Sequence, residues 1–134
     1  MEGRAVGGDL LTGGNGADIY YYDDASQSTS LGFDTIFGFD DSADTIDVPF
    51  TVNGLAGPAS GNLSNVSFDS DLSSAFAGLT SHQAGMFTAT GGDMAGRTFL
   101  VIDADGNAGY QAGSDYVIEI VTPVTPIDNP AIFV

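Results

Sequence analysis

Residues 13–21 read GGNGADIYY, and this stretch decides which fold the sequence predicts. Its glycines adopt positive φ angles at little steric cost, so the backbone can turn tightly and expose its carbonyl oxygens. Asp18 follows them, and carboxylate and carbonyl oxygens are the ligands that calcium prefers. The residues after Asp18 alternate, as in a β-strand that sends Tyr20 into the core. The stretch therefore predicts a calcium-binding turn that leads into a strand.

The same pattern occurs a second time, directly upstream. Residues 13–21 fit the repeat G-G-x-G-x-D-x-U-x, in which U is a large apolar residue. Residues 4–12, RAVGGDLLT, keep this register in weaker form. The two units resemble the calcium-binding repeats of RTX proteins, whose parallel strands coil into a β-roll. The resemblance implies the end of such a roll, with calcium ligands at Gly7, Asp9, Gly14, Gly16 and Asp18 and a further ligand from a neighbouring residue such as Asp23 or Asp24.

The segment 34–48, DTIFGFDDSADTIDV, continues the series of acidic turns. It resembles the block that follows the last repeat in serralysin-type proteases and other type I secretion substrates. Gly38 departs from that block, because a second aspartate is common at its position. The remaining candidate calcium ligands are Asp34, Asp40, Asp44 and Asp47. Aspartate is also a favoured turn residue, so the alternative is that these side chains simply end strands.

Residues 97–121 carry a third acidic loop, between two apolar runs. Its D-x-D-x-N order presents oxygen ligands as the start of an EF-hand loop does. Ser114 stands where that loop has a glutamate and no helices flank it, so we expect a β-hairpin with a calcium-binding loop. The candidate ligands are Asp103, Asp105, Asn107 and Asp115. The segment also resembles the bluetail domain, found at the C-termini of large cyanobacterial exported proteins with RTX repeats.

Strand signals outnumber helix signals along the chain. Runs of β-branched and aromatic residues predict strands over 18–22, 34–39, 44–48, 97–102 and 115–122. One helix is expected over 70–79, where apolar residues recur at helical spacing. We expect a mainly β fold over 1–134, a single domain in which the end of a parallel β-roll continues into a β-sandwich-like or β-roll-like C-terminal part. Its expected sections are a roll end over 6–48, an irregular, helix-containing insert over 50–95, and a β-hairpin with a tail over 96–134.

The charge of the chain restricts its partners. It has 18 acidic and two basic residues, no lysine, and a formal net charge of −16. This charge argues strongly against nucleic acid and anionic membrane surfaces as partners, because too few basic groups are available to meet phosphates. The chain has no cysteine, which excludes disulfides and thiolate metal sites. No apolar run approaches the roughly 18 residues of a transmembrane helix.

Catalysis finds little support in the sequence. The single histidine, His82, has no evident partner, and the absence of lysine excludes a Schiff base. Pairs such as Asp40 and Asp41 arise by chance among so many aspartates. The aromatic residues over 20–22 and 33–39 alternate, which favours a core over a sugar-stacking platform. We therefore expect a protein that is not an enzyme.

These patterns together lead to a functional prediction. The chain ends in the apolar run AIFV, and in RTX proteases the C-terminal region is the signal that an ABC transporter reads. We expect a calcium-binding C-terminal module of a secreted bacterial surface protein, which folds on calcium outside the cell and carries the type I secretion signal. The alternative is a calcium-dependent adhesion or assembly module that binds glycan or its own copies at the cell surface.

Overall fold

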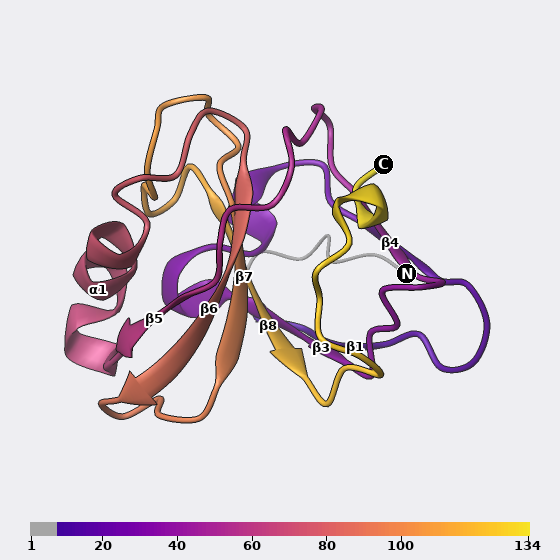
Figure 1. The fold of residues 1–134 in the computed structure, drawn as a ribbon, viewed down its shortest axis with the longest axis horizontal. Coiled ribbons are helices and arrows are strands. Elements are labelled where there is room, and N and C mark those ends of the chain that lie inside the picture. Colours follow the sequence, from indigo (N-terminus) through magenta and orange to yellow (C-terminus); the bar gives the residue numbers. More distant parts are fainter. Residues whose placement is uncertain (1–7) are drawn as a thin grey trace.

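The fold is built on a mixed six-stranded sheet with the order β1-β3-β8-β7-β6-β5 (Figure 1). The computed structural model describes residues 8–134, so the predicted ligand Gly7 lies outside the described residues. The strands of this sheet are β1 (Leu10–Thr12), β3 (Asp34–Phe37), β5 (Ala59–Asn62), β6 (Ala84–Gly91), β7 (Thr98–Ile102) and β8 (Tyr116–Val121). A second sheet has two strands, β2 (Ile19–Tyr21) and β4 (Thr45–Asp47). The prediction of a mainly β chain is confirmed.

The N-terminal strands pair in parallel, each with the strand after next. β1 pairs with β3, so that Leu11 lies opposite Ile36, and β2 pairs with β4, so that Tyr20 lies opposite Ile46. All four of these side chains are buried. Each stands two positions after an aspartate, and this spacing turns it to the inner face of its strand. The expected burial of Tyr20 is therefore confirmed.

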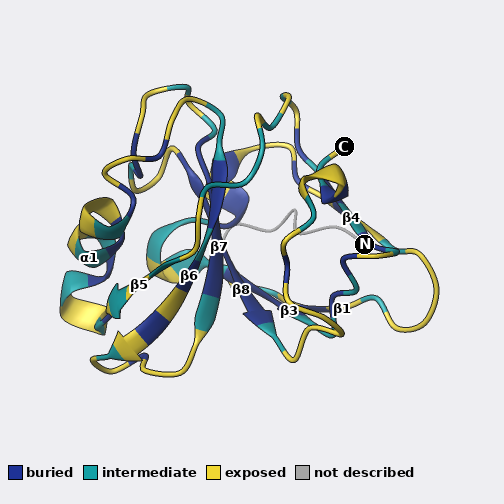
Figure 2. Ribbon diagram, in the orientation of Figure 1, coloured by how far each residue is buried: buried dark blue, intermediate teal, exposed yellow. Residues whose placement is uncertain are grey.

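The central strands β7 and β8 are buried on both faces. They are antiparallel to each other, and β8 is also parallel to β3. Their sequences are nearly continuous apolar runs, as expected for strands that are covered on both sides. Figure 1 shows the helix α1 (Phe68–Ala75) on one side of these strands and β4 on the other. Figure 2 shows the buried residues concentrated between these layers.

The helix is shorter than the sequence predicts and begins earlier. It starts at Phe68 and ends at Ala75, because Phe76 leaves the helical region with φ −107° and ψ 24°. Leu72, Phe76 and Leu79 are nevertheless all buried, as their spacing indicates. Four single 3-10 turns complete the helical content of residues 8–134, at Ala25–Gln27, Ser30–Gly32, Asn65–Ser67 and Pro130–Ile132.

Strand β6 lies in the section that was expected to be irregular. It is eight residues long and reads AGMFTATG, with few strong strand formers. It pairs with β7 on one side and β5 on the other. Gly85 in this strand lies directly under the ring of Phe76, where a Cβ atom would overlap the ring. The strand is thus stabilised by its neighbours and by close packing, which local propensity does not reveal.

Candidate metal centre

Three aspartates meet at one end of the β7–β8 hairpin. Asp103 directly follows β7 and Asp115 directly precedes β8. Because Ile102 lies opposite Tyr116 in this antiparallel pair, the two aspartates come to the same edge of the sheet. With Asp105 from the connecting loop, they offer carboxylate oxygens that all lie within 4.8 Å of one another. This is the arrangement that the sequence predicts for three of its four candidate ligands in this loop.

The loop wraps around the carboxylate of Asp115. Its Oδ1 accepts hydrogen bonds from the backbone N–H groups of Ala104 (2.9 Å) and Asp105 (3.4 Å), and its Oδ2 accepts one from Gln111 (2.7 Å). These bonds favour the ionised carboxylate. Burial, and secondarily the nearby carboxyl group of Asp103, outweigh them and raise the pKa of Asp115 to about 6. Asp115 is therefore a buried carboxylate that lacks a positive partner among the described residues.

Asp103 is the most revealing member of the cluster. Its side chain is fully buried, and its Oδ2 accepts the backbone N–H of His82 at 2.9 Å. Its Oδ1 is buried and has no hydrogen-bond partner within residues 8–134. A buried polar atom of this kind costs about 1–3 kcal/mol when it stays unpaired. A cation beside Oδ1 would remove this cost. The unpaired Oδ1 atom therefore points to a cation independently of the acidity of the cluster.

Asp105 forms the exposed side of the cluster. Its carboxylate accepts the backbone N–H of Asn107 at 2.9 Å and the side-chain amide of Asn107 at 3.3 Å. Desolvation raises the pKa of Asp105, but these hydrogen bonds outweigh it and hold the pKa below its usual value. Asn107 therefore orients Asp105 within the loop. An ion at this site would be closed in by Asp103 and Asp115 and open to solvent beside Asp105.

A different arrangement holds the aspartates of the parallel strands. Asp34 accepts the backbone N–H of Asp9 (2.8 Å) and the hydroxyl of Tyr22 (2.9 Å). Asp44 accepts the backbone N–H of Asp18 at 2.9 Å, in the equivalent position on the other sheet. Each of these carboxylates thus bonds the backbone just before the neighbouring parallel strand. Both aspartates stand at the start of their own strands, so this is a structural role that differs from the strand-ending turns left open as an alternative to metal binding.

The remaining predicted ligands are scattered among turns. Asp40 accepts the backbone N–H of Ser42, and Asp24 accepts that of Ser26 at the start of the 25–27 turn. Asp47 ends β4 and is half-buried. In residues 8–134 the only group of three or more His, Cys, Asp or Glu side chains that could share an ion is the Asp103 cluster. No second group of such side chains is formed by the other predicted acidic ligands, which are Asp9, Asp18, Asp24, Asp34, Asp40, Asp44 and Asp47.

The glycine turn of residues 13–18 has the expected backbone. Gly14 and Gly16 have φ angles of +89° and +95°. The Oδ2 atom of Asp18 is buried without a hydrogen-bond partner among the described residues, and a Cβ atom on Gly13 would overlap it. The turn thus leaves one carboxylate oxygen unpaired, and among the described residues Asp18 belongs to no group of three His, Cys, Asp or Glu side chains that could share an ion.

His82 contributes to the centre in a way that the sequence does not reveal. Its backbone N–H bonds Asp103, and its ring Nδ1 lies 3.2 Å from the carbonyl oxygen of the same residue. Its φ angle is +56°, in the left-handed region that is uncommon for a residue other than glycine. The ring also lies 5.0 Å from that of Phe50. No local signal marks a histidine that acts through its backbone.

Comparison of the chain with models of protein families, with curated proteins and with solved structures finds no match. The single α-helix of residues 8–134 is eight residues long, and no described helix could cross a membrane.

Proposed function

We propose that this chain is a calcium-binding module in which Asp103, Asp105 and Asp115 hold the ion. The observation that carries the proposal is the buried Oδ1 atom of Asp103, which lacks a partner among the described residues and belongs to a cluster of three carboxylates. Only oxygen atoms are offered, which suits a hard cation such as calcium and not zinc. The ion would supply positive charge and no redox chemistry, and the proposal gives the chain no catalytic role.

The charge of the whole chain supports the same proposal. The formal net charge is −16, and Arg97, the only arginine or lysine of the described part, is already bound to Glu119. Burying Asp103 and Asp115 side by side adds like-charge repulsion to the folded state. Calcium binding would therefore stabilise the folded state more strongly than the unfolded one, so binding and folding are coupled.

We further propose that the parallel strands are the last coils of a β-roll. The support is the pairing of each strand with the strand after next, β1 with β3 and β2 with β4. The repeated use of an aspartate to bond the backbone before the preceding coil, Asp34 to Asp9 and Asp44 to Asp18, agrees with this reading. With the resemblance to RTX proteins, it leads to a secreted bacterial surface protein as the parent and to a type I export signal at the C-terminus.

Far-ultraviolet circular dichroism tests the coupling of calcium to folding. In EDTA we expect a largely disordered chain, and on addition of calcium a gain of β-structure that magnesium does not reproduce at equal concentration. Asp128→Asn is a matched control, because Asp128 is exposed and lies outside the cluster. A chain with the same folded spectrum in EDTA and in calcium would contradict the coupled-folding proposal. Secretion is tested separately, by fusing the chain to a reporter in a strain with a type I exporter.

A further inference from the structure

The carboxylates of the metal centre are already engaged in hydrogen bonds to their own loop and its neighbours. Oδ2 of Asp103 accepts the N–H of His82, and both oxygens of Asp115 accept backbone N–H groups. The carboxylate of Asp105 accepts two hydrogen bonds from Asn107. A calcium ion in a protein takes about six to eight oxygen ligands. Carboxylates engaged in this way leave part of its coordination shell to other oxygens.

Gln111, in the same loop, carries an oxygen that the described residues leave without a partner. Its side-chain Oε1 atom is buried and accepts no hydrogen bond within residues 8–134. The other atom of the amide group, Nε2, donates to the carbonyl oxygen of Ala108 at 3.0 Å. This bond sets the orientation of the amide, because a flipped amide would turn its oxygen towards that carbonyl. A buried oxygen without a donor is unfavourable, and a cation beside it would satisfy it.

The backbone of Gln111 is tied to the metal centre. Its N–H donates to Oδ2 of Asp115 at 2.7 Å, and its carbonyl oxygen accepts the N–H of Asp115 at 3.0 Å. Its side chain then returns to Ala108, which belongs to the same 103–115 loop. Because a glutamine side chain is short, its amide group stays in the neighbourhood of the Asp115 carboxylate. Two of the unpaired buried oxygens, on Asp103 and Gln111, thus belong to residues that adjoin this carboxylate.

We infer that Oε1 of Gln111 is a further ligand of the calcium ion, which it would share with the carboxylates of Asp103, Asp105 and Asp115. The inference rests on the proposed calcium site and adds a neutral oxygen to its three carboxylates. Amide oxygens are among the ligands that calcium takes. The ion would pair both buried oxygens that this loop leaves without a donor, and the bond to Ala108 would hold the amide in place.

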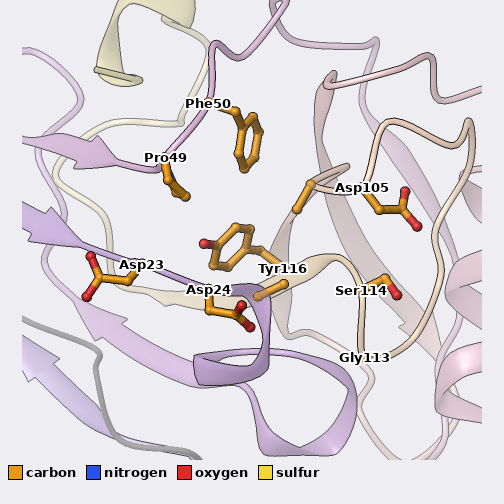
Figure 3. A pocket seen from close by; sticks show the side chains of 10 residues that line it. Asp23, Asp24, Pro49, Phe50, Asp105, Gly113, Ser114 and Tyr116 are labelled. Carbon is orange, nitrogen blue, oxygen red and sulfur yellow. The ribbon is translucent and has the colours of Figure 1, made fainter.

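Solvent has access to the centre on its Asp105 side, where the loop borders a hollow of about 310 Å³ (Figure 3). Asp105, Gly113 and Ser114 line the hollow from the loop, and Figure 3 shows the ring of Tyr116 in its middle. Water from this side would complete the coordination shell of the ion. The number of bound waters therefore measures how many ligands the protein itself supplies.

Terbium luminescence tests the inference, with this hard cation as the probe in place of calcium. The chain has no tryptophan, so its tyrosines, among them Tyr116 next to Asp115, sensitise the bound ion. Emission lifetimes in H₂O and D₂O give the number of water molecules on the ion. Competition with calcium gives the affinity for calcium. We expect the wild type to show sensitised emission that calcium displaces.

Two variants at position 111 separate a ligand from a side chain that only supports the loop. Gln111→Met keeps the length of the side chain and removes its oxygen, whereas Gln111→Glu keeps an oxygen and removes the donor to Ala108. We expect Gln111→Met to gain a water on the ion and to bind calcium about tenfold more weakly. Gln111→Glu should keep the wild-type water count and at least the wild-type affinity. Ser114→Ala, which removes an exposed hydroxyl from the same loop, should leave both quantities unchanged.

Two results would overturn the inference. The first is an unchanged water count in Gln111→Met. The second is an equal loss in Gln111→Met and Gln111→Glu, because a side chain that acts only through its bond to Ala108 would be affected alike in both. Loss of binding in Gln111→Met alone would support a ligand role. Failure of the calcium proposal itself is recognised in the wild type, which would then show neither sensitised emission nor calcium binding, and the inference would fall with it.

Discussion

From the structure we expect Asp103→Asn to raise the stability of the fold without calcium and to lower it, relative to the wild type, in calcium. Asparagine has nearly the same shape, and its oxygen can still accept the N–H of His82. Its amide group then occupies the position of the unpaired Oδ1 and can donate to a neighbouring carboxylate. The variant therefore keeps the hydrogen bond, satisfies a buried atom and removes one negative charge from the cluster.

The size of the effect follows from the separation of the charges. Two unit charges 4.8 Å apart repel each other by about 3.5 kcal/mol at an effective dielectric constant of about 20. Solvent at the exposed Asp105 side screens part of this repulsion, so we expect a gain of about 1–2 kcal/mol in the free energy of unfolding without calcium. The variant should also lose most of the stabilisation that calcium gives to the wild type. At 100 times the dissociation constant, an intact site contributes about 2.7 kcal/mol.

Urea unfolding in EDTA and in saturating calcium measures both effects. The order of stability of the wild type and Asp103→Asn should reverse between the two conditions. The variant should be the more stable protein in EDTA, and the wild type should be the more stable protein in calcium. If the wild type is unfolded in EDTA, the variant should show the larger folded fraction there. Asp128→Asn supplies the control for a change of one charge at an exposed position. A variant that is destabilised in EDTA and keeps the full calcium response would refute the reasoning.

Three further predictions concern other parts of the fold. Burial raises the pKa of Asp34 to about 6, so the folded state binds a proton more tightly than the unfolded state, and the metal-free protein should gain about 1–2 kcal/mol as the pH falls from about 7 to about 5. Gly85→Ala places a Cβ atom against the ring of Phe76 and should lower stability by about 1–3 kcal/mol in thermal unfolding. Arg97→Gln leaves Glu119 buried without its ion pair and should cost about 1–3 kcal/mol in urea unfolding.

Each of these predictions has its own control. Asp34→Asn should reduce the pH dependence but not abolish it, because the pKa of Asp115 is also raised to about 6. An unchanged slope would assign the effect to other groups. Gly78→Ala, where a Cβ atom meets nothing within 4 Å, should be tolerated, and equal loss in both alanine variants would rule out the steric argument. The double variant Arg97→Gln with Glu119→Gln should recover part of the loss. If it is less stable than the single variant, the buried charge is not the cause.

The loop of the metal centre was predictable because its signals are local. Apolar runs on both sides marked β7 and β8, and the aspartates at their ends had to meet once the two runs formed a hairpin. The roles of Asp34 and Asp44 were not predictable in this way. Each bonds an N–H group that lies about 25 positions earlier in the chain, so its role depends on the register of a parallel pair. Strand β6 was not predicted from the sequence, because its pairing with neighbouring strands stabilises it more than the strand propensity of its own residues does.

Isothermal titration of calcium into the wild type and Asp115→Asn tests the central claim most directly. Asp115 is the buried carboxylate around which the loop closes, and asparagine would keep its approximate shape while removing its charge. We predict that the wild type binds calcium and that Asp115→Asn loses one ion or binds it at least tenfold more weakly, about 1.4 kcal/mol. Identical stoichiometry and affinity in the two proteins would contradict a calcium site at Asp103, Asp105 and Asp115.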